Sequence, residues 1–164
     1  MHKIPLEFRK HRGKAEIQPP MKNFAVRSPG AKVGELVYFG RMLDKIRAHA
    51  KGELPGEYQP NLGKGFDRSC LDLLQIDYDE LVERVKESET DEQILDWCFT
   101  KGRKPSESEI HVWNEFMRKR GWNDKLSETL SRRKEEAGMA GRSDILTMFD
   151  FIDADEGRFP KGDS

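Results

Sequence analysis

Residues 77–121 read DYDELVERVKESETDEQILDWCFTKGRKPSESEIHVWNEFMRKRG. In three places an Asp, Thr or Ser is followed three residues later by Glu or Gln, at Asp77–Glu80, Thr90–Gln93 and Ser106–Glu109. This is the spacing of the capping box, in which two side chains satisfy backbone N–H groups at the start of a helix. Apolar residues recur at three- and four-residue intervals after each signal, which is the helical period. The stretch therefore predicts three consecutive helices and an all-α fold.

The same criteria, applied to the remainder of the chain, predict a compact bundle of about six or seven helices. We place them roughly at residues 31–51, 67–75, 78–88, 91–101, 107–120, 124–137 and 144–153. The first helix is expected to be the longest. Asp67, Asn123 or Asp124, and Ser143 are expected to cap later helices. Few segments alternate between polar and apolar residues, so any strand should be short and peripheral.

The composition divides the chain into three parts. Residues 1–23 are expected to form an irregular basic arm, because residues 1–22 contain six Lys or Arg against two Glu and are interrupted by prolines. We expect a single helical domain over residues 24–158 and a tail over residues 159–164. The net charge of the whole chain is −1, so the residues that follow the arm carry an excess of acidic groups.

Several classes of protein are disfavoured by what the sequence lacks. No apolar run approaches the ~18 residues of a membrane span and no signal peptide opens the chain, so we expect a cytoplasmic protein. Cys70 and Cys98 lie in apolar helical patterns, which favours buried free thiols over a disulfide or a zinc site. The acidic residues 150–157 do not have the register of a calcium loop. The sequence predicts no metal and no cofactor, and it contains no standard nucleotide-binding or hydrolase motif.

The helix predicted over residues 31–51 carries charges inside its apolar sector. With successive residues 100° apart, Asp44 and Arg47 fall within this sector or at its edge, and Gly40 lies between them. Because buried charges require partners, Asp44 and Arg47 can form a structural ion pair, with Gly40 allowing another helix to approach. The alternatives are that these charges line a cleft for a small polar ligand, or that they contact a partner.

The ligand-site hypothesis adds the neighbouring basic residues of this helix. Arg41, Lys45 and Arg47 would neutralise a phosphorylated or acidic molecule, and Asp44 or His49 would move a proton. His49 falls on the outer side of the helix, near Lys45. A histidine at that position more often complements the helix dipole than acts as a base.

A second candidate for anion binding is the turn formed by Gly63, Lys64 and Gly65. Glycines before a helix expose backbone N–H groups, and a lysine there can hold a phosphate or a carboxylate. Asp67 argues against this reading, because a carboxylate at the start of the helix repels an anion. The alternative is a flexible loop.

The aromatic residues give little indication of a nucleic-acid partner. Trp97, Trp113 and Phe116 lie within helical faces, where packing in the core is the default. Aromatic residues interleaved with basic ones are not evident beyond Phe24 and Arg27, and a pI near 6.5 is not that of a dedicated nucleic-acid binder. Nucleic acid is therefore a disfavoured partner at this stage.

Several motifs resemble a family of uncharacterised bacterial proteins. They are Arg27-Ser-Pro29 with Gly34, Arg41–Ala48, Gly65–Arg68, Ile94–Trp97, Pro105–Asn114 and Phe151–Arg158. The resemblance covers roughly residues 24–158 and excludes the basic arm. It implies no activity, cofactor or catalytic residue, because the family is a domain of unknown function.

Three functions are compatible with the sequence. Dense helix capping and missing catalytic motifs favour a helical binding or interaction module without catalytic activity of its own. The first alternative is an enzyme or binding protein for a small phosphorylated or acidic molecule. The second is a nucleic-acid- or ribosome-associated factor that uses the basic arm. Whether the protein is an enzyme stays open at this stage.

Overall fold

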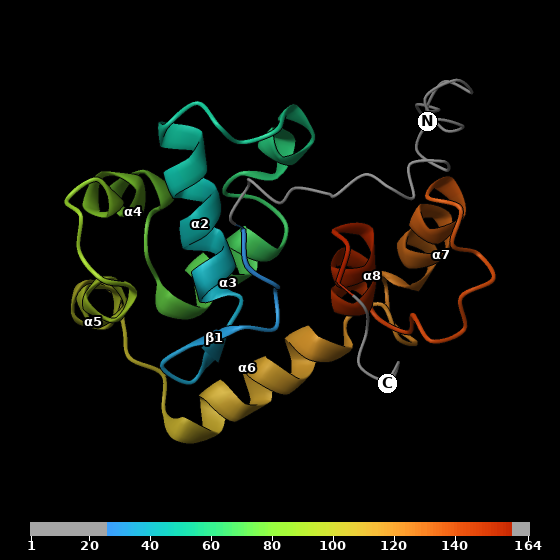
Figure 1. Cartoon of the computed structure of the whole chain (residues 1–164). Helices are drawn as coiled ribbons and strands as arrows, with labels where there is room; N and C mark the ends of the chain where they lie inside the picture. The colour runs from blue at the N-terminus through green and yellow to red at the C-terminus, as the bar shows by residue number, and fades with distance from the viewer. Residues whose placement is uncertain (1–25, 159–164) are drawn as a thin grey trace. The chain divides into compact units, whose positions relative to one another are not determined.

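The computed structural model describes residues 26–158, which form helices joined by turns and short loops (Figure 1). These residues belong to two compact units, which we describe separately: an N-terminal unit that ends at Glu115 and a C-terminal unit that begins at Phe116. The predicted arm (1–23) and tail (159–164) lie outside the described residues. Among the described helices, none has both the length and the apolar character required to cross a membrane.

The all-α fold class is confirmed. The elements of the N-terminal unit are β1 (Lys32–Val33), β2 (Leu36–Val37), α2 (Phe39–Ala50), the 3-10 helix η2 (Gly56–Asn61), α3 (Phe66–Leu74), α4 (Tyr78–Val85), α5 (Asp91–Lys101) and most of α6 (Glu107–Lys119). The C-terminal unit contains the end of α6, then α7 (Ser127–Glu136) and α8 (Met148–Asp155). Within the described part of the chain the strands are two residues long, which agrees with the expectation of short strands.

The helix predicted over residues 31–51 is wrong in its first third. Gly34, with a φ of 59°, turns the chain so that β1 and β2 pair antiparallel, with Val33 opposite Leu36. The hairpin buries the apolar residues whose spacing also fits a helix, and short apolar runs are ambiguous in this way. The helix that follows, α2, has 12 residues and α6 has 13, so the first helix is not the longest.

The three capping signals of residues 77–121 are all present. The bonds are Glu80 N to Asp77 Oδ2 (3.1 Å), the reciprocal pair of Thr90 and Gln93 (2.9 and 3.1 Å), and the reciprocal pair of Ser106 and Glu109 (2.8 and 3.1 Å). Each bond joins residues three apart in the chain, so local sequence is sufficient to specify it.

The other predicted caps are wrong. The side chain of Asp67 is directed into the interior, and α3 has no side-chain cap. Neither Asn123 nor Asp124 caps α7, which also lacks a side-chain cap. Thr147 rather than Ser143 caps α8, so that this helix begins later than predicted. The carboxylates of Asp67 and Asp124 accept hydrogen bonds elsewhere in the fold instead.

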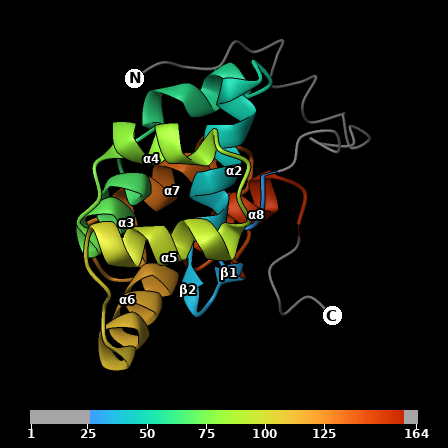
Figure 2. The same cartoon turned by 90° about the vertical axis from the view of Figure 1, so that its left-hand side faces the viewer.

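Helix α2 supplies much of the core of the N-terminal unit. It packs against α4 and the hairpin, and α4 in turn lies beside α5 (Figures 1 and 2). Asn114 of α6 joins the hairpin through two hydrogen bonds, accepting from Val37 N at 3.1 Å and donating to the Glu35 carbonyl at 2.7 Å. The fully buried side chains of this unit include Phe39, Met42, Leu43, Leu71, Leu74, Leu81 and Ile94.

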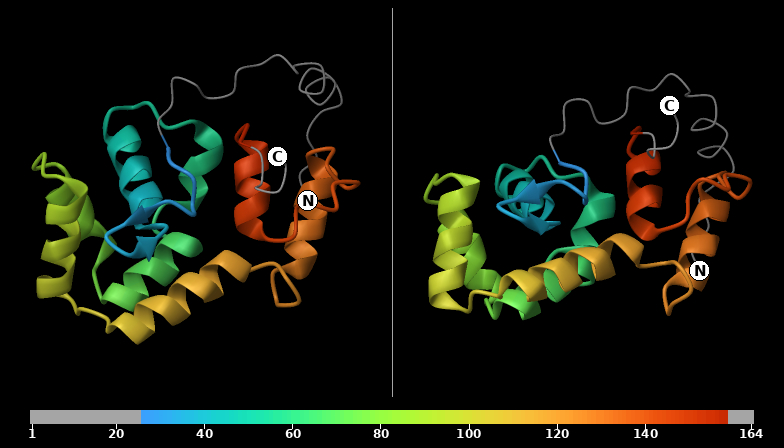
Figure 3. Two further views of the ribbon diagram at one scale, coloured as in Figure 1. Left: turned by 60° about the horizontal axis from the view of Figure 1, so that its bottom comes forward. Right: turned by 90° about the horizontal axis from the view of Figure 1, so that it is seen from below.

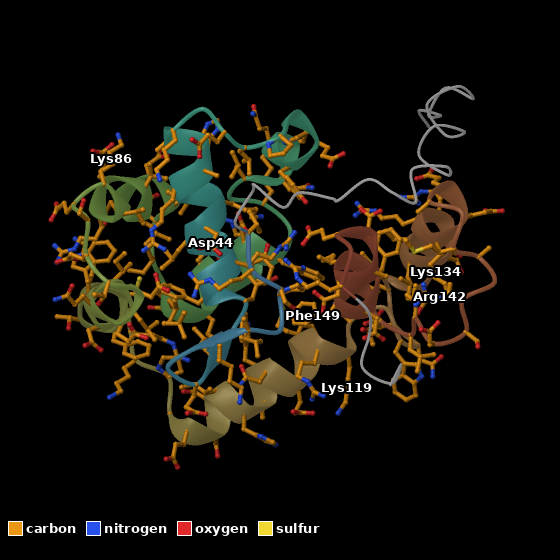
Figure 4. The ribbon with its side chains drawn as sticks, in the orientation of Figure 1. Asp44, Lys86, Lys119, Lys134, Arg142 and Phe149 are labelled. Carbon is orange, nitrogen blue, oxygen red and sulfur yellow. The ribbon has the colours of Figure 1, made fainter. Side chains whose placement is uncertain are left out.

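In the C-terminal unit, α7 and α8 lie side by side (Figure 3). Lys134 of α7 holds the loop between these two helices, because its Nζ donates to the carbonyls of Arg142 and Ile145 at 2.7 and 3.0 Å (Figure 4). Met148 N donates to the Arg120 carbonyl at 2.8 Å, which holds the start of α8 against the turn that follows α6.

Candidate functional site

The N-terminal unit contains a buried polar cluster formed by Tyr38, Lys45 and Asp67. The Tyr38 hydroxyl donates to Asp67 Oδ1 at 2.7 Å, and Lys45 Nζ lies 2.9 Å from the same oxygen. Lys45 Nζ also donates to the Tyr38 hydroxyl at 3.1 Å, and Gly63 N donates to Asp67 Oδ2 at 2.9 Å. The side chains of Lys45 and Asp67 are 5% and 0% exposed. The cluster therefore joins α2, α3 and the loop between them.

Tyr38 is unusual in both its backbone and its phenol. Its φ of 75° places an aromatic residue in the left-handed region, at the position that precedes α2. Burial, together with the negative charge of Asp67, raises the pKa of the Tyr38 phenol well above its usual value. The phenol therefore stays protonated at neutral pH and acts as a hydrogen-bond donor to Asp67.

Arg41 lies one helical turn before Lys45 and is also buried. One of its guanidinium nitrogens donates to the Arg27 carbonyl at 3.0 Å, and its Cζ lies 5.8 Å from the centroid of the Tyr58 ring in η2. The helical wheel placed Lys45 near the outer side of the helix. That reading is wrong, because α3 places Asp67 against that side of α2, 2.9 Å from Lys45 Nζ.

A second charged network is half-buried and links three segments of the chain. Arg27 forms a two-pronged interaction with Asp44, from Nε and from a terminal nitrogen, each at 2.9 Å. It also lies 2.8 Å from Asp91 at the start of α5, and Arg47 lies 2.8 Å from Asp91 and 3.7 Å from Asp44. Asp44 and Arg47 do pair, as the ion-pair hypothesis holds, but Arg27 makes the shorter contacts to Asp44.

The electrostatics of this network favour its charged forms. Burial alone would raise the pKa of Asp91, but hydrogen bonds from Arg27 and Arg47 outweigh that effect and lower it. Hydrogen bonding to Asp44 raises the pKa of Arg27. Gly40 admits the Arg27 guanidinium rather than another helix, since a Cβ at Gly40 would lie 2.8 Å from Arg27 Cζ. Figure 4 labels Asp44 on α2.

Of the remaining sequence candidates, Gly63 joins the buried polar cluster through its backbone N–H. His49 is exposed in the last turn of α2. Gly63 has a φ of 73°. Its N–H donates to the Asp67 carboxylate, so Asp67 takes the position at which the sequence hypothesis placed an anionic ligand. Lys64 is exposed, and Gly65 precedes α3. Among residues 26–158, no group of three or more His, Cys, Asp or Glu side chains is arranged to hold a metal ion.

The aromatic residues divide differently from the sequence prediction. Trp113 is buried, as expected. Trp97 is half-buried, with the Arg84 guanidinium 5.5 Å from its ring. Phe116, predicted to pack in the core, is 51% exposed, and Trp122 is 56% exposed. Val112 and Leu146 are the other large apolar side chains described as strongly exposed.

Phe116 and Trp122 belong to a stretch of the C-terminal unit that we call the aromatic–basic segment, residues 116–125 (FMRKRGWNDK). Arg118, Lys119 and Lys125 are exposed in it, and Arg120 lies with its Cζ 5.0 Å from the centroid of the Phe116 ring. Figure 4 shows Lys119 at the end of α6. The sequence reasoning missed this segment, although the alternation of aromatic and basic residues is visible in the sequence.

The turn that carries Trp122 is closed by hydrogen bonds between side chains and backbone. Asp124 accepts from Gly121 N through both carboxylate oxygens at 3.0 Å and from Leu126 N at 2.8 Å. Ser127 Oγ donates to the Gly121 carbonyl at 3.0 Å. Gly121 has a φ of 100°, and a Cβ there would lie 3.0 Å from Met148 N, so a side chain at this position would be strained.

Comparison with protein families matches residues 23–158 to a domain of unknown function, DUF5069. The chain belongs to the DUF5069 family. The match confirms the resemblance expected over residues 24–158. It places both charged networks and the aromatic–basic segment inside the DUF5069 domain. No curated protein matches the sequence.

Proposed function

We propose that this protein is a macromolecular binding module without catalytic activity of its own, and that it binds through the aromatic–basic segment. The exposure of Phe116 and Trp122 supports the proposal. Phe116 at the end of α6 and Trp122 in the turn that follows are each about half exposed, and large exposed aromatic rings are typical of binding anchors because little side-chain entropy is lost on association.

The buried polar cluster supports the non-catalytic part of the proposal. Lys45, Tyr38 and Asp67 hydrogen-bond to one another in the interior, and Asp67 also accepts from the backbone of Gly63. Groups used in this way fix the positions of α2, α3 and the intervening loop. Asp44 and Arg47 play a similar part in holding α5 near α2.

Site-specific photo-crosslinking in cells tests the proposal. A benzophenone amino acid replaces Trp122 in one variant and Phe116 in a second. The matched control replaces Lys86, an exposed residue at the end of α4 that lies in the other unit (Figure 4). We expect discrete crosslinked species from positions 116 and 122 and none from position 86. Equal crosslinking from all three positions, or none from any, would contradict the proposal.

A further inference from the structure

We propose that the aromatic–basic segment binds single-stranded nucleic acid, with bases stacked on Phe116 and Trp122 and phosphates contacted by Arg118, Lys119 and Lys125. This inference rests on the proposed binding function and names its ligand class. The sequence analysis disfavoured nucleic acid on the pI near 6.5 and on the assignment of aromatic residues to the core, and the structure contradicts the second ground for Phe116, which is 51% exposed.

The aromatic rings provide the first part of the argument. A base stacks on a ring only where the ring face is open, and the bases of a single strand are free of the pairing that a duplex imposes. Phe116 and Trp122 are each more than half exposed. The Arg120 guanidinium lies over the Phe116 ring, with its Cζ 5.0 Å from the ring centroid, so it covers one face of that ring and offers its own plane for stacking.

The charges provide the second part. The segment contains four basic residues and a single acid, Asp124. Asp124 accepts hydrogen bonds from the backbone of its own loop, and its carboxylate lies 3.7 Å from Arg120 Nε. Its negative charge is therefore locally compensated. The exposed cations at 118, 119 and 125 then attract the phosphates of a polyanion.

The kind of side chain that is exposed favours nucleic acid over a peptide. A nucleotide offers a flat base and an anionic phosphate, which match a ring and a cation. Met117, the aliphatic residue of the segment, is fully buried, so the segment itself exposes rings and cations, while Leu146, elsewhere in the unit, is 57% exposed. The side chains of Asp124 and Ser127 hydrogen-bond to the backbone of Gly121 and so hold the turn that carries Trp122.

Fluorescence anisotropy of the full chain with labelled dT12 and rU12 oligonucleotides at 50 mM salt tests the inference. We expect saturable binding by the parent protein. Trp122→Ala should weaken it by about tenfold or more, since stacking contributes ~1–3 kcal/mol per base. Trp122→Phe should retain most of the affinity. Replacing Arg118 and Lys119 together by Gln should reduce the slope of log K against log salt by about 1.4, as expected for two phosphate contacts.

The control variant changes the same charge elsewhere in the unit. Arg132 and Arg133 are exposed on α7, outside the segment, and their joint replacement by Gln should leave the affinity within about twofold of the parent. Thermal melting of every variant establishes that each one is folded.

Three outcomes would overturn the inference. The first is no binding by the parent protein, and the second is unchanged affinity in a folded Trp122→Ala variant. The third is equal loss in the α7 control, which would indicate general attraction of a polyanion. If the oligonucleotides fail but crosslinks from position 122 yield a defined protein adduct, the ligand class is wrong and the proposed binding function still stands. If both experiments fail, the proposed function fails as well.

Discussion

Asp67 is the residue on which the buried polar cluster depends. It is fully buried, it lies 2.9 Å from Lys45 Nζ, and it accepts hydrogen bonds from Tyr38 and from Gly63 N. A buried ion pair contributes little net free energy relative to an apolar pair, but the removal of one partner leaves a charge in a medium of low dielectric. The cluster therefore makes the fold sensitive to substitutions at this position.

We predict that Asp67→Asn lowers the free energy of unfolding by about 3–5 kcal/mol, because Lys45 loses the carboxylate beside it. Urea denaturation measures the change. Asp72→Asn is the matched control in the same helix, since its side chain is 68% exposed, and it should change stability by no more than about 0.5 kcal/mol. Adding Lys45→Met to Asp67→Asn should restore part of the loss. Equal effects at positions 67 and 72 would show that the cluster has no structural role.

At the scale of the elements, the close approach of α5 to the end of α3 depends on Gly102. A Cβ at this position would overlap the Leu74 carbonyl oxygen and lie 2.7 Å from the Gln75 carbonyl oxygen. These are backbone atoms, which cannot rotate away as a side chain can. Arg103 N donates to the Leu74 carbonyl at 3.0 Å, so a displaced loop also strains this hydrogen bond.

We predict that Gly102→Ala destabilises the protein by about 2 kcal/mol or more, through backbone displacement at the junction of α3 and α5. Gly56→Ala is the control, because nothing lies within 4 Å of the Cβ added there. Thermal melting of the two variants under the same conditions gives the comparison. If the melting temperature of Gly102→Ala equals that of the parent, α3 and α5 can move apart at this junction with little loss of stability.

At the scale of the whole molecule, the ionisable groups predict a stability plateau near neutral pH. The pKa of Asp91 is lowered in the folded state, and the pKa values of Glu109 and Asp144 are lowered by hydrogen bonds with Ser106 and Arg142 respectively. The stabilisation that such carboxylates provide is present above their unfolded pKa of about 4 and is lost as the pH falls through the lower folded value.

The alkaline side has the opposite sign. Burial raises the pKa values of Tyr78 and Cys98 to about 12, and it also raises those of Tyr38 and Cys70. These groups stabilise the fold below their unfolded pKa values, about 8.5 for Cys and 10 for Tyr. Their contribution is lost as the pH rises toward the folded values.

We therefore predict that the free energy of unfolding is nearly constant between about pH 5 and 8 and falls on both sides. Urea denaturation from pH 2.5 to 11 measures this profile. In the Asp91→Asn variant the free energy of unfolding should fall less steeply at acid pH. In the Cys98→Ala variant it should fall less steeply between pH 8 and 10. If the free energy of unfolding of these variants changes with pH as steeply as that of the parent, other ionisable groups cause the pH dependence.

Local sequence specified the three helix starts of residues 77–121, whereas tertiary packing determined which side chains are exposed. The capping boxes at 77–80, 90–93 and 106–109 are specified within four residues of chain, so they could be predicted from the sequence. The charged candidates of α2 were identified in the same way. Their principal partners Arg27, Asp67 and Asp91 were not, because these lie outside α2 and meet it only after folding.

The hairpin and the aromatic–basic segment show the same limit. Apolar spacing at residues 33–37 fits a strand pair as well as a helix, and only pairing across Gly34 distinguishes them. The rings and cations of residues 116–125 are visible in the sequence, but helical periodicity alone places Phe116 in the core. The structure leaves that ring exposed, because burial depends on what packs against a face and not on the period of the face itself.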